Sequence, residues 1–217
     1  YTFAKVLSDA AGDNQSRFEA FLDLRNGKIE RARTPFDLTH AFKLNGLMDL
    51  PFGQGRKFSI SNSTLNQIFG GWQISGFMTW QSGSPFSVLA PRGTLNRAAR
   101  SAQNTAVSTA DKSALDDLFG FRMTGNGPMF INQSAINPAD GRAVAADGRA
   151  PFSGQVFFNP GPGQIGSLQR RMFTGPAFWN TDLAVLKAFN INERHIIEFR
   201  SEWFNFSNTP SFDFGDQ

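Results

Sequence analysis

The sequence contains no cysteine, and this absence excludes several kinds of chemistry at once. Disulfides, thiolate metal sites, iron–sulfur clusters and cysteine nucleophiles all require that side chain. Histidine is almost as scarce, because His40 and His195 are the only two among 217 residues. One copy of the chain therefore cannot form a site with several histidine ligands. We expect no metal site and no cofactor.

The sequence also lacks a strong excess of charge of either sign. It has 21 lysine and arginine residues against 18 aspartate and glutamate residues, which gives a net charge of +3. Nucleic-acid-binding domains normally cluster basic residues on one face, so we expect no nucleic-acid partner. No apolar run approaches the length of about 18 residues that a membrane helix needs, and the sequence predicts no such helix.

Phenylalanine, in contrast, is abundant. There are 24 phenylalanines against a single tyrosine, while charged residues make up only 18% of the chain. These rings are diluted by glycine, serine, asparagine and glutamine rather than by the lysine and glutamate of helical soluble proteins. Such a composition fits a soluble β-sandwich, and it also fits a membrane β-barrel, whose apolar outer band is offset by a polar lumen and polar loops.

Several segments alternate between apolar and polar side chains, which is typical of a strand with two different faces. The pattern predicts long strands at residues 36–50, 72–88, 178–189 and 195–206, and a weaker strand at residues 1–8. Four segments keep this alternation for roughly ten residues, whereas soluble strands average about 5–6 residues. A bilayer crossing takes about 9–11 residues, so the strand lengths favour a membrane barrel.

The connections between these strands alternate in length. Residues 51–58 and 190–194 are expected to be turns, while residues 89–176 form a long region rich in glycine, proline, alanine and asparagine. Membrane barrels combine long extracellular loops with short periplasmic turns. We expect the long loop to recognise a solute, with candidates chosen by location alone: Arg92, Arg97, Arg100, Asn104 and Asp111.

Residue parity divides the strand side chains between a polar and an apolar face. The polar side chains, which we expect to face the lumen of a barrel, are Asp37, Lys43, Asn45, Gln73, Gln81, Asp182, Glu198, Arg200 and Glu202. The side chains that we expect to face lipid or to lie at the membrane interface are Phe42, Met48, Trp72, Trp80, Phe189 and Trp203.

Alternation by itself does not separate a membrane barrel from a soluble sandwich, because the period is the same whether the apolar face meets lipid or another sheet. Strand length favours the barrel. So does the placement of Trp72, Phe189 and His195 near the predicted periplasmic ends, where aromatic girdles lie. We prefer an all-β antiparallel meander from a transmembrane β-barrel, with the soluble sandwich as the alternative.

Three blocks of the sequence carry a family resemblance. They are RTPFDLTHAFKLNGLMDLPFGQGRKF, GGWQISGFMTWQSGSPFSV and GPAFWNTDLAVLKAFNINERHIIEFRSEWFNFSNTPSF. In this order they resemble the C-terminal barrel region of TonB-dependent outer-membrane receptors, of the type with a carboxypeptidase-regulatory-like N-terminal domain. The blocks cover about half of the chain, and the specificity lies in their combination.

The resemblance implies a location in the outer membrane of a Gram-negative bacterium. It implies import of a scarce solute, an oligosaccharide or a metal chelate, with no enzymatic activity. The implied partners are outer-membrane lipid, the rest of the barrel, the plug and the TonB complex.

The sequence lacks several parts that are typical of this family. Nothing in it resembles the plug or a final strand that ends in an aromatic residue, and about five strands are fewer than the eight that a bacterial barrel needs. Open sheet edges in lipid cost several kcal/mol for each unpaired backbone group. We therefore expect the chain to be part of a larger barrel.

Possible catalytic motifs are weak. The segment GPGQIG at residues 161–166 has the spacing of a dinucleotide loop, but no strand precedes it and no helix follows, so we expect a plain loop. Glu198 and Glu202 would lie about 13 Å apart along one strand, too far for glycosidase chemistry. We expect an ion ladder with Asp182 there instead. A hydrolase with His40 or His195 stays open, although no G-x-S-x-G motif occurs.

Two further functions remain possible from the residues. One is a scaffold subunit whose strand edges are covered by other subunits. The other is a soluble all-β carbohydrate-binding module, in which the tryptophans would stack on sugar rings.

Overall fold

We describe a computed structural model of the chain, which covers residues 1–9, 26–90, 104–125, 127–146, 148–192 and 194–212. The residues fall into two compact units. The sheet unit contains Tyr1–Thr2, Ala41–Gln81 and Phe178–Phe212, and the loop unit contains Phe3–His40 and Ser82–Ala177. No helix in the described part of the chain is long and apolar enough to span a membrane.

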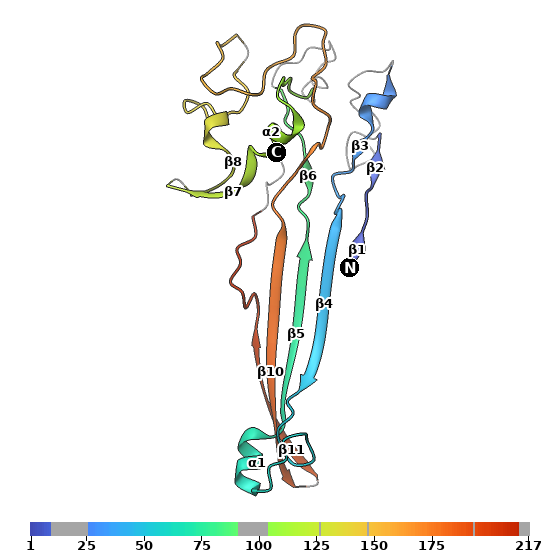
Figure 1. Cartoon of the computed structure of the whole chain (residues 1–217), viewed down its shortest axis with the longest axis vertical. Coiled ribbons are helices and arrows are strands. Elements are labelled where there is room, and N and C mark those ends of the chain that lie inside the picture. The colour runs from blue at the N-terminus through green and yellow to red at the C-terminus, as the bar shows by residue number, and fades with distance from the viewer. Residues whose placement is uncertain (10–25, 91–103, 126, 147, 193, 213–217) are drawn as a thin grey trace. The chain divides into compact units, whose positions relative to one another are not determined.

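One antiparallel sheet dominates the sheet unit (Figure 1). We call it the long sheet, and its strand order is β1-β4-β5-β10-β11. The alternating segments form its long strands, which confirms an all-β antiparallel fold. The strands are β1 (Thr2–Phe3), β4 (His40–Asp49), β5 (Trp72–Gln81), β10 (Phe178–Asn192) and β11 (His195–Trp203).

The register of the long sheet aligns the faces of neighbouring strands. Phe42 pairs with Trp80, which pairs on its other side with Trp179. Asn45 pairs with Phe77, whose other partner is Asp182. Paired residues of an antiparallel ladder point to the same face, so the sequence period extends across the whole sheet as two distinct faces.

The strand bounds differ from the sequence prediction in several places. β4 begins at His40 rather than at residue 36, and residues 1–8 contain two separate strands of two residues each. β5 ends at Gln81 and does not continue to residue 88; β6 (Pro85–Phe86) is separate. Between the two strands the backbones of Gly83 and Gly175 approach closely, since a Cβ added at Gly83 would lie 2.1 Å from the carbonyl oxygen of Gly175.

A short helix occupies the connection between β4 and β5. α1 (Ser63–Phe69) contains the apolar residues Leu65, Ile68 and Phe69. The side chain of Asn62 caps it by accepting a hydrogen bond from the backbone N–H of Leu65 at 3.1 Å, which satisfies a donor that a helix start leaves free. The indole of Trp72 donates to the carbonyl oxygen of Ile68 at 2.8 Å and fixes the helix to the start of β5.

The loop unit has its own secondary structure, although the sequence predicted residues 89–176 as a loop. Its strands pair as β2-β3, β6-β9 and β7-β8. Its elements include β2 (Leu7–Ser8), η1 (Gly27–Glu30), β3 (Ala32–Arg33), α2 (Lys112–Asp116), β7 (Phe119–Thr124), β8 (Gly127–Ile131), η3 (Gln133–Ala135) and β9 (Phe173–Thr174).

A hydrophobic core lies inside the loop unit. Phe157 is fully buried there, and Phe119 packs against Phe173 and Phe86 with ring centroids 4.5 and 5.1 Å apart. Part of the unusual phenylalanine content therefore folds this region rather than the long sheet. The buried cluster consists of Ala106, Leu115, Val144, Phe157, Leu168 and Phe173.

Candidate membrane and lumen surfaces

The apolar face of the long sheet is exposed. Leu44, Met48 and Phe199 have exposed fractions of 55%, 57% and 61%. The buried hydrophobic cluster lies in the loop unit, and the described residues of the sheet unit form no second sheet that could cover this face. This arrangement contradicts a sandwich that would bury Phe42, Met78 and Phe199 in a shared interior. The members of the apolar face include Phe42, Leu44, Met48, Trp72, Ile74, Met78, Trp80, Trp179, Leu183, Val185, Phe189, Ile197, Phe199 and Trp203.

The opposite face carries the polar side chains that the sequence pattern grouped together. Lys43, Asn45 and Asp49 on β4 pair with Thr79, Phe77 and Gln73 on β5. The register continues this face across β10 and β11. The predicted residues that share it are Lys43, Asn45, Gln73, Gln81, Asp182, Glu198, Arg200 and Glu202.

Asp37 does not share this polar face. It precedes β4 and is fully buried, and its Oδ1 accepts a hydrogen bond from the backbone N–H of Val6 at 2.8 Å. Its Oδ2 accepts a second one from the Thr39 hydroxyl at 3.2 Å. Asp37 therefore holds the chain before β2 rather than facing a lumen, because a buried carboxylate needs such donors.

The expected ion ladder between Asp182 and β11 does not form either. Arg200 pairs with Glu202 on its own strand, with 2.5 Å between Nη2 and Oε1. Asp182 instead accepts hydrogen bonds from the Asn180 amide at 3.0 Å and from the backbone N–H of Asn205 at 2.9 Å. Because Leu186 is the residue opposite Arg200, the register keeps Asp182 and Arg200 apart.

A shallow hollow of about 470 Å³ lies on the sheet unit around Phe77. Phe77 is 42% exposed although its neighbours on the polar face are hydrophilic. In the sequence, the one sign that this apolar side chain lies on the polar face is its odd number within β5, which it shares with Gln73 and Gln81. The lining includes Asn45, Phe77, Asp182, Arg200 and Glu202.

Three side chains, Asp49, Gln73 and Arg56, form a second polar cluster near one end of β4. Asp49 accepts a hydrogen bond from the Gln73 amide at 2.7 Å through Oδ1, and its Oδ2 pairs with Arg56 at 3.0 Å. Gln73 belongs to the predicted polar face, but the alternation of side chains does not connect it to Arg56. The link is a property of the turn between β4 and α1, which alternation does not describe.

The residues of the long connection that were expected to contact a solute have structural roles where the structure describes them. The fully buried Asn104 accepts a hydrogen bond from the backbone N–H of Gly166 at 3.0 Å and donates to the carbonyl oxygen of Gln164 at 3.2 Å. Asp111 caps α2, and the backbone N–H of Ala114 lowers the pKa of its carboxyl. Arg92, Arg97 and Arg100 lie outside the described residues.

The two candidate histidines contact neighbouring side chains. His40 packs on Phe3 with ring centroids 5.3 Å apart, and the His195 ring lies 2.9 Å from the Asn192 side chain. Residues 161–166 form a loop, as predicted. No group of three or more histidine, aspartate or glutamate residues could hold a metal ion in the part of the chain that the structure describes.

The chain belongs to a family of outer-membrane proteins. It matches the family described as an outer membrane beta barrel domain over residues 1–217. The wall of an outer-membrane barrel is an antiparallel sheet with an apolar outer face and a polar inner face. The long sheet has two faces of this kind. The location is therefore the outer membrane, and the Gram-negative bacteria are the organisms that this implies. No curated protein and no solved structure matches the chain.

Proposed function

We propose that the chain forms part of the barrel of a TonB-dependent transporter that imports a scarce solute, an oligosaccharide or a metal chelate. The observation that carries the proposal is the division of the long sheet into two faces within an outer-membrane barrel family. One face is apolar and suits lipid. The other carries Lys43, Glu198, Arg200 and Glu202, and such charges need water or a polar partner inside the barrel.

The motif blocks support the transport assignment over a simple pore. The segments that resemble TonB-dependent receptors coincide with β4, β5, β10 and β11, in chain order. The connection between β5 and β10 belongs to the loop unit, which has its own hydrophobic core. Loops held on a rigid scaffold are where binding residues concentrate. The proposed partners are outer-membrane lipid, the rest of the barrel, a plug and the TonB complex.

In this proposal the chain performs no covalent chemistry. Its long strands supply the wall, its polar face contacts the plug or the solute, and its loop unit binds the solute on arrival. Energy comes from the inner-membrane proton gradient through the TonB complex. The barrel residues therefore affect binding and passage, whereas the energy-coupling step belongs to other parts of the transporter.

Uptake measurements test this proposal. Cells with and without the gene are given a panel of radiolabelled oligosaccharides and iron chelates, in the presence and absence of a protonophore. We expect one class to accumulate only in cells that carry the gene, and we expect the protonophore to abolish that accumulation. Passage that persists after uncoupling would mean a passive pore. Equal uptake in the two strains for every solute would contradict import altogether.

A further inference from the structure

The loop unit contains a cleft whose charged lining residues are all basic. Its volume is about 660 Å³, within the range of about 300–1,000 Å³ typical of small-molecule sites. No aspartate or glutamate lines it in the part of the chain that the structure describes. The basic residues that line it are Lys5, Arg31, Arg33, Lys112, Arg170 and Arg171.

Only some of these cations are neutralised by carboxylates. Arg170 forms a buried ion pair with Glu30 at 2.7 Å, and Lys112 pairs with Asp116 at 2.5 Å. No described carboxylate forms an ion pair with Lys5, Arg31 or Arg33. A cleft lined by one sign of charge between low-dielectric walls concentrates ions of the opposite sign.

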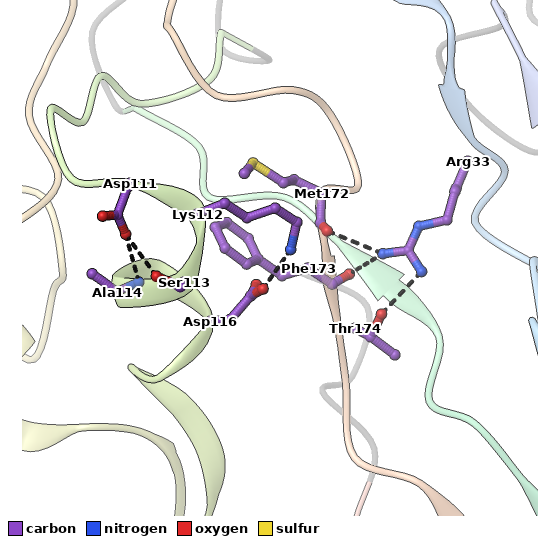
Figure 2. Close-up of polar contacts among 9 residues, drawn as sticks. All are labelled: Arg33, Asp111, Lys112, Ser113, Ala114, Asp116, Met172, Phe173 and Thr174. Atoms are coloured by element: carbon purple, nitrogen blue, oxygen red, sulfur yellow. Dashed lines mark hydrogen bonds and ion pairs between the residues drawn. The ribbon is translucent and has the colours of Figure 1, made fainter.

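Arg33, one of the residues that line the cleft, is held by several hydrogen bonds (Figure 2). The Arg33 guanidinium donates to the carbonyl oxygens of Met172 at 3.2 Å and Phe173 at 2.8 Å, and to the Thr174 hydroxyl at 2.9 Å. All of these acceptors are neutral, and the one carboxylate that acts on Arg33 electrostatically among the described residues is Asp37, which forms no ion pair with it. Burial lowers the pKa of Arg33 although Asp37 acts in the opposite direction, and an arginine stays protonated at neutral pH.

Two further cations lie at the surface of the cleft. Arg31 and Arg33 flank Ala32, which is 1% exposed; since side chains alternate along an extended chain, both arginines lie on the side opposite Ala32. Arg31 and Lys5 are exposed. Their charged ends can therefore reach a ligand without breaking an ion pair to a described carboxylate.

We propose that this cleft binds a small polyanion, a solute that carries two or more carboxylate or phosphate groups. Arg33 provides a charge that hydrogen bonds hold in place, and Arg31 and Lys5 bind the anionic groups. Guanidinium groups match the geometry of carboxylate and phosphate oxygens. This inference rests on the proposed function, because it names the chemical class of the imported solute.

Calorimetric titration of the intact, detergent-solubilised protein tests the site without transport. The probes are citrate and pyrophosphate at low ionic strength, and micelles doped with phosphatidylglycerol form the lipid arm. We expect saturable binding of at least one soluble probe. The double variant Lys5→Gln/Arg31→Gln should weaken that binding at least about tenfold, because charge-assisted bonds to both groups are lost.

The matched control is Arg142→Gln/Arg149→Gln, which removes the same charge from exposed positions of the loop unit that do not line the cleft. It should leave the affinity unchanged. Equal affinity in both double variants, no saturable binding of either soluble probe, or binding of phosphatidylglycerol alone would overturn the proposal. Binding that persists when uptake ignores the protonophore would refute the transport mechanism and leave the site intact.

Discussion

Lys187 places a positive charge among apolar side chains at the α1 end of the long sheet. It lies on the apolar face, paired with Trp72 and Phe199, yet it is only 2% exposed. Its Nζ donates to the carbonyl oxygen of Gly70 and lies 4.7 Å from the centroid of the Phe189 ring. A cation on a lipid-facing surface is costly, and here a carbonyl oxygen and aromatic rings replace its water.

We expect Lys187→Ala to lower the free energy of unfolding by about 1–3 kcal/mol, because the Gly70 carbonyl loses its donor and the rings lose their contact. Urea-induced unfolding of the intact protein in phospholipid vesicles measures the change. The control Lys43→Ala removes an exposed lysine from the polar face and should change stability by less than about 0.5 kcal/mol. Equal stability of the two variants would refute a role for Lys187 in holding the α1 connection.

Gly166 shows a different constraint at the residue scale. A Cβ at this position would lie 1.9 Å from the carbonyl oxygen of Thr105. Gly166→Ala should therefore force the two segments apart and destabilise the loop unit by about 1–3 kcal/mol, the usual cost of overpacking.

Limited proteolysis of the intact protein measures this effect as faster cleavage within the loop unit. Gly27→Ala is the control, because nothing lies within 4 Å of a Cβ there. Cleavage at the same rate in both variants would mean that the close approach of Gly166 and Thr105 does not limit stability.

Among the elements, β5 provides the sharpest test of the two faces. Phe77 and Met78 are neighbours in sequence, but the register places Phe77 opposite Asn45 and Met78 opposite Leu44. An arginine on the lipid face of a barrel costs about 2–4 kcal/mol near the bilayer midplane. Met78→Arg should therefore reduce the amount of folded protein in the outer membrane severely, whereas Phe77→Arg should leave it nearly unchanged.

Membrane fractionation followed by heat-modifiability on gels reports the folded fraction of each variant. The two substitutions add the same side chain one residue apart, so each controls for the other. If the Met78→Arg protein folds in the outer membrane and the Phe77→Arg protein does not, the two faces are reversed.

The elements also show which features a sequence can reveal. Alternation predicted β4, β5, β10 and β11 because the period is a local property of each strand. It misplaced Asp37, whose hydrogen-bond donor on Val6 is 31 residues away. It also predicted a loop at 89–176, where the short strands are defined by distant partners, as in the pairing of Phe86 with Phe173.

The candidate sites also differ in whether local sequence or distant contacts define them. The polar face was predictable, since its members repeat every second residue along each strand. The basic cleft was not, because Arg33 lies 138 residues or more from the backbone carbonyls that hold it. Lys187 was within reach of the sequence, because it has the same parity as Val185 on β10 and therefore falls on the apolar face.

At the scale of the whole molecule, a barrel wall requires the apolar face of the long sheet to meet lipid. The absence of cysteine from this chain allows single cysteines to be introduced without interference from its other residues. Two adjacent pairs sample the faces: Leu44→Cys with Asn45→Cys on β4, and Phe199→Cys with Glu198→Cys on β11.

The most direct measurement attaches a fluorescent label to each cysteine in the intact protein within phospholipid vesicles, free of other cysteines, and compares quenching by spin-labelled lipid with quenching by aqueous iodide. We expect spin-labelled lipid to quench the labels at residues 44 and 199, and iodide to be the more effective quencher at residues 45 and 198. Lipid quenching at residues 45 and 198, or equal quenching within each pair, would contradict a barrel wall with its apolar face toward lipid.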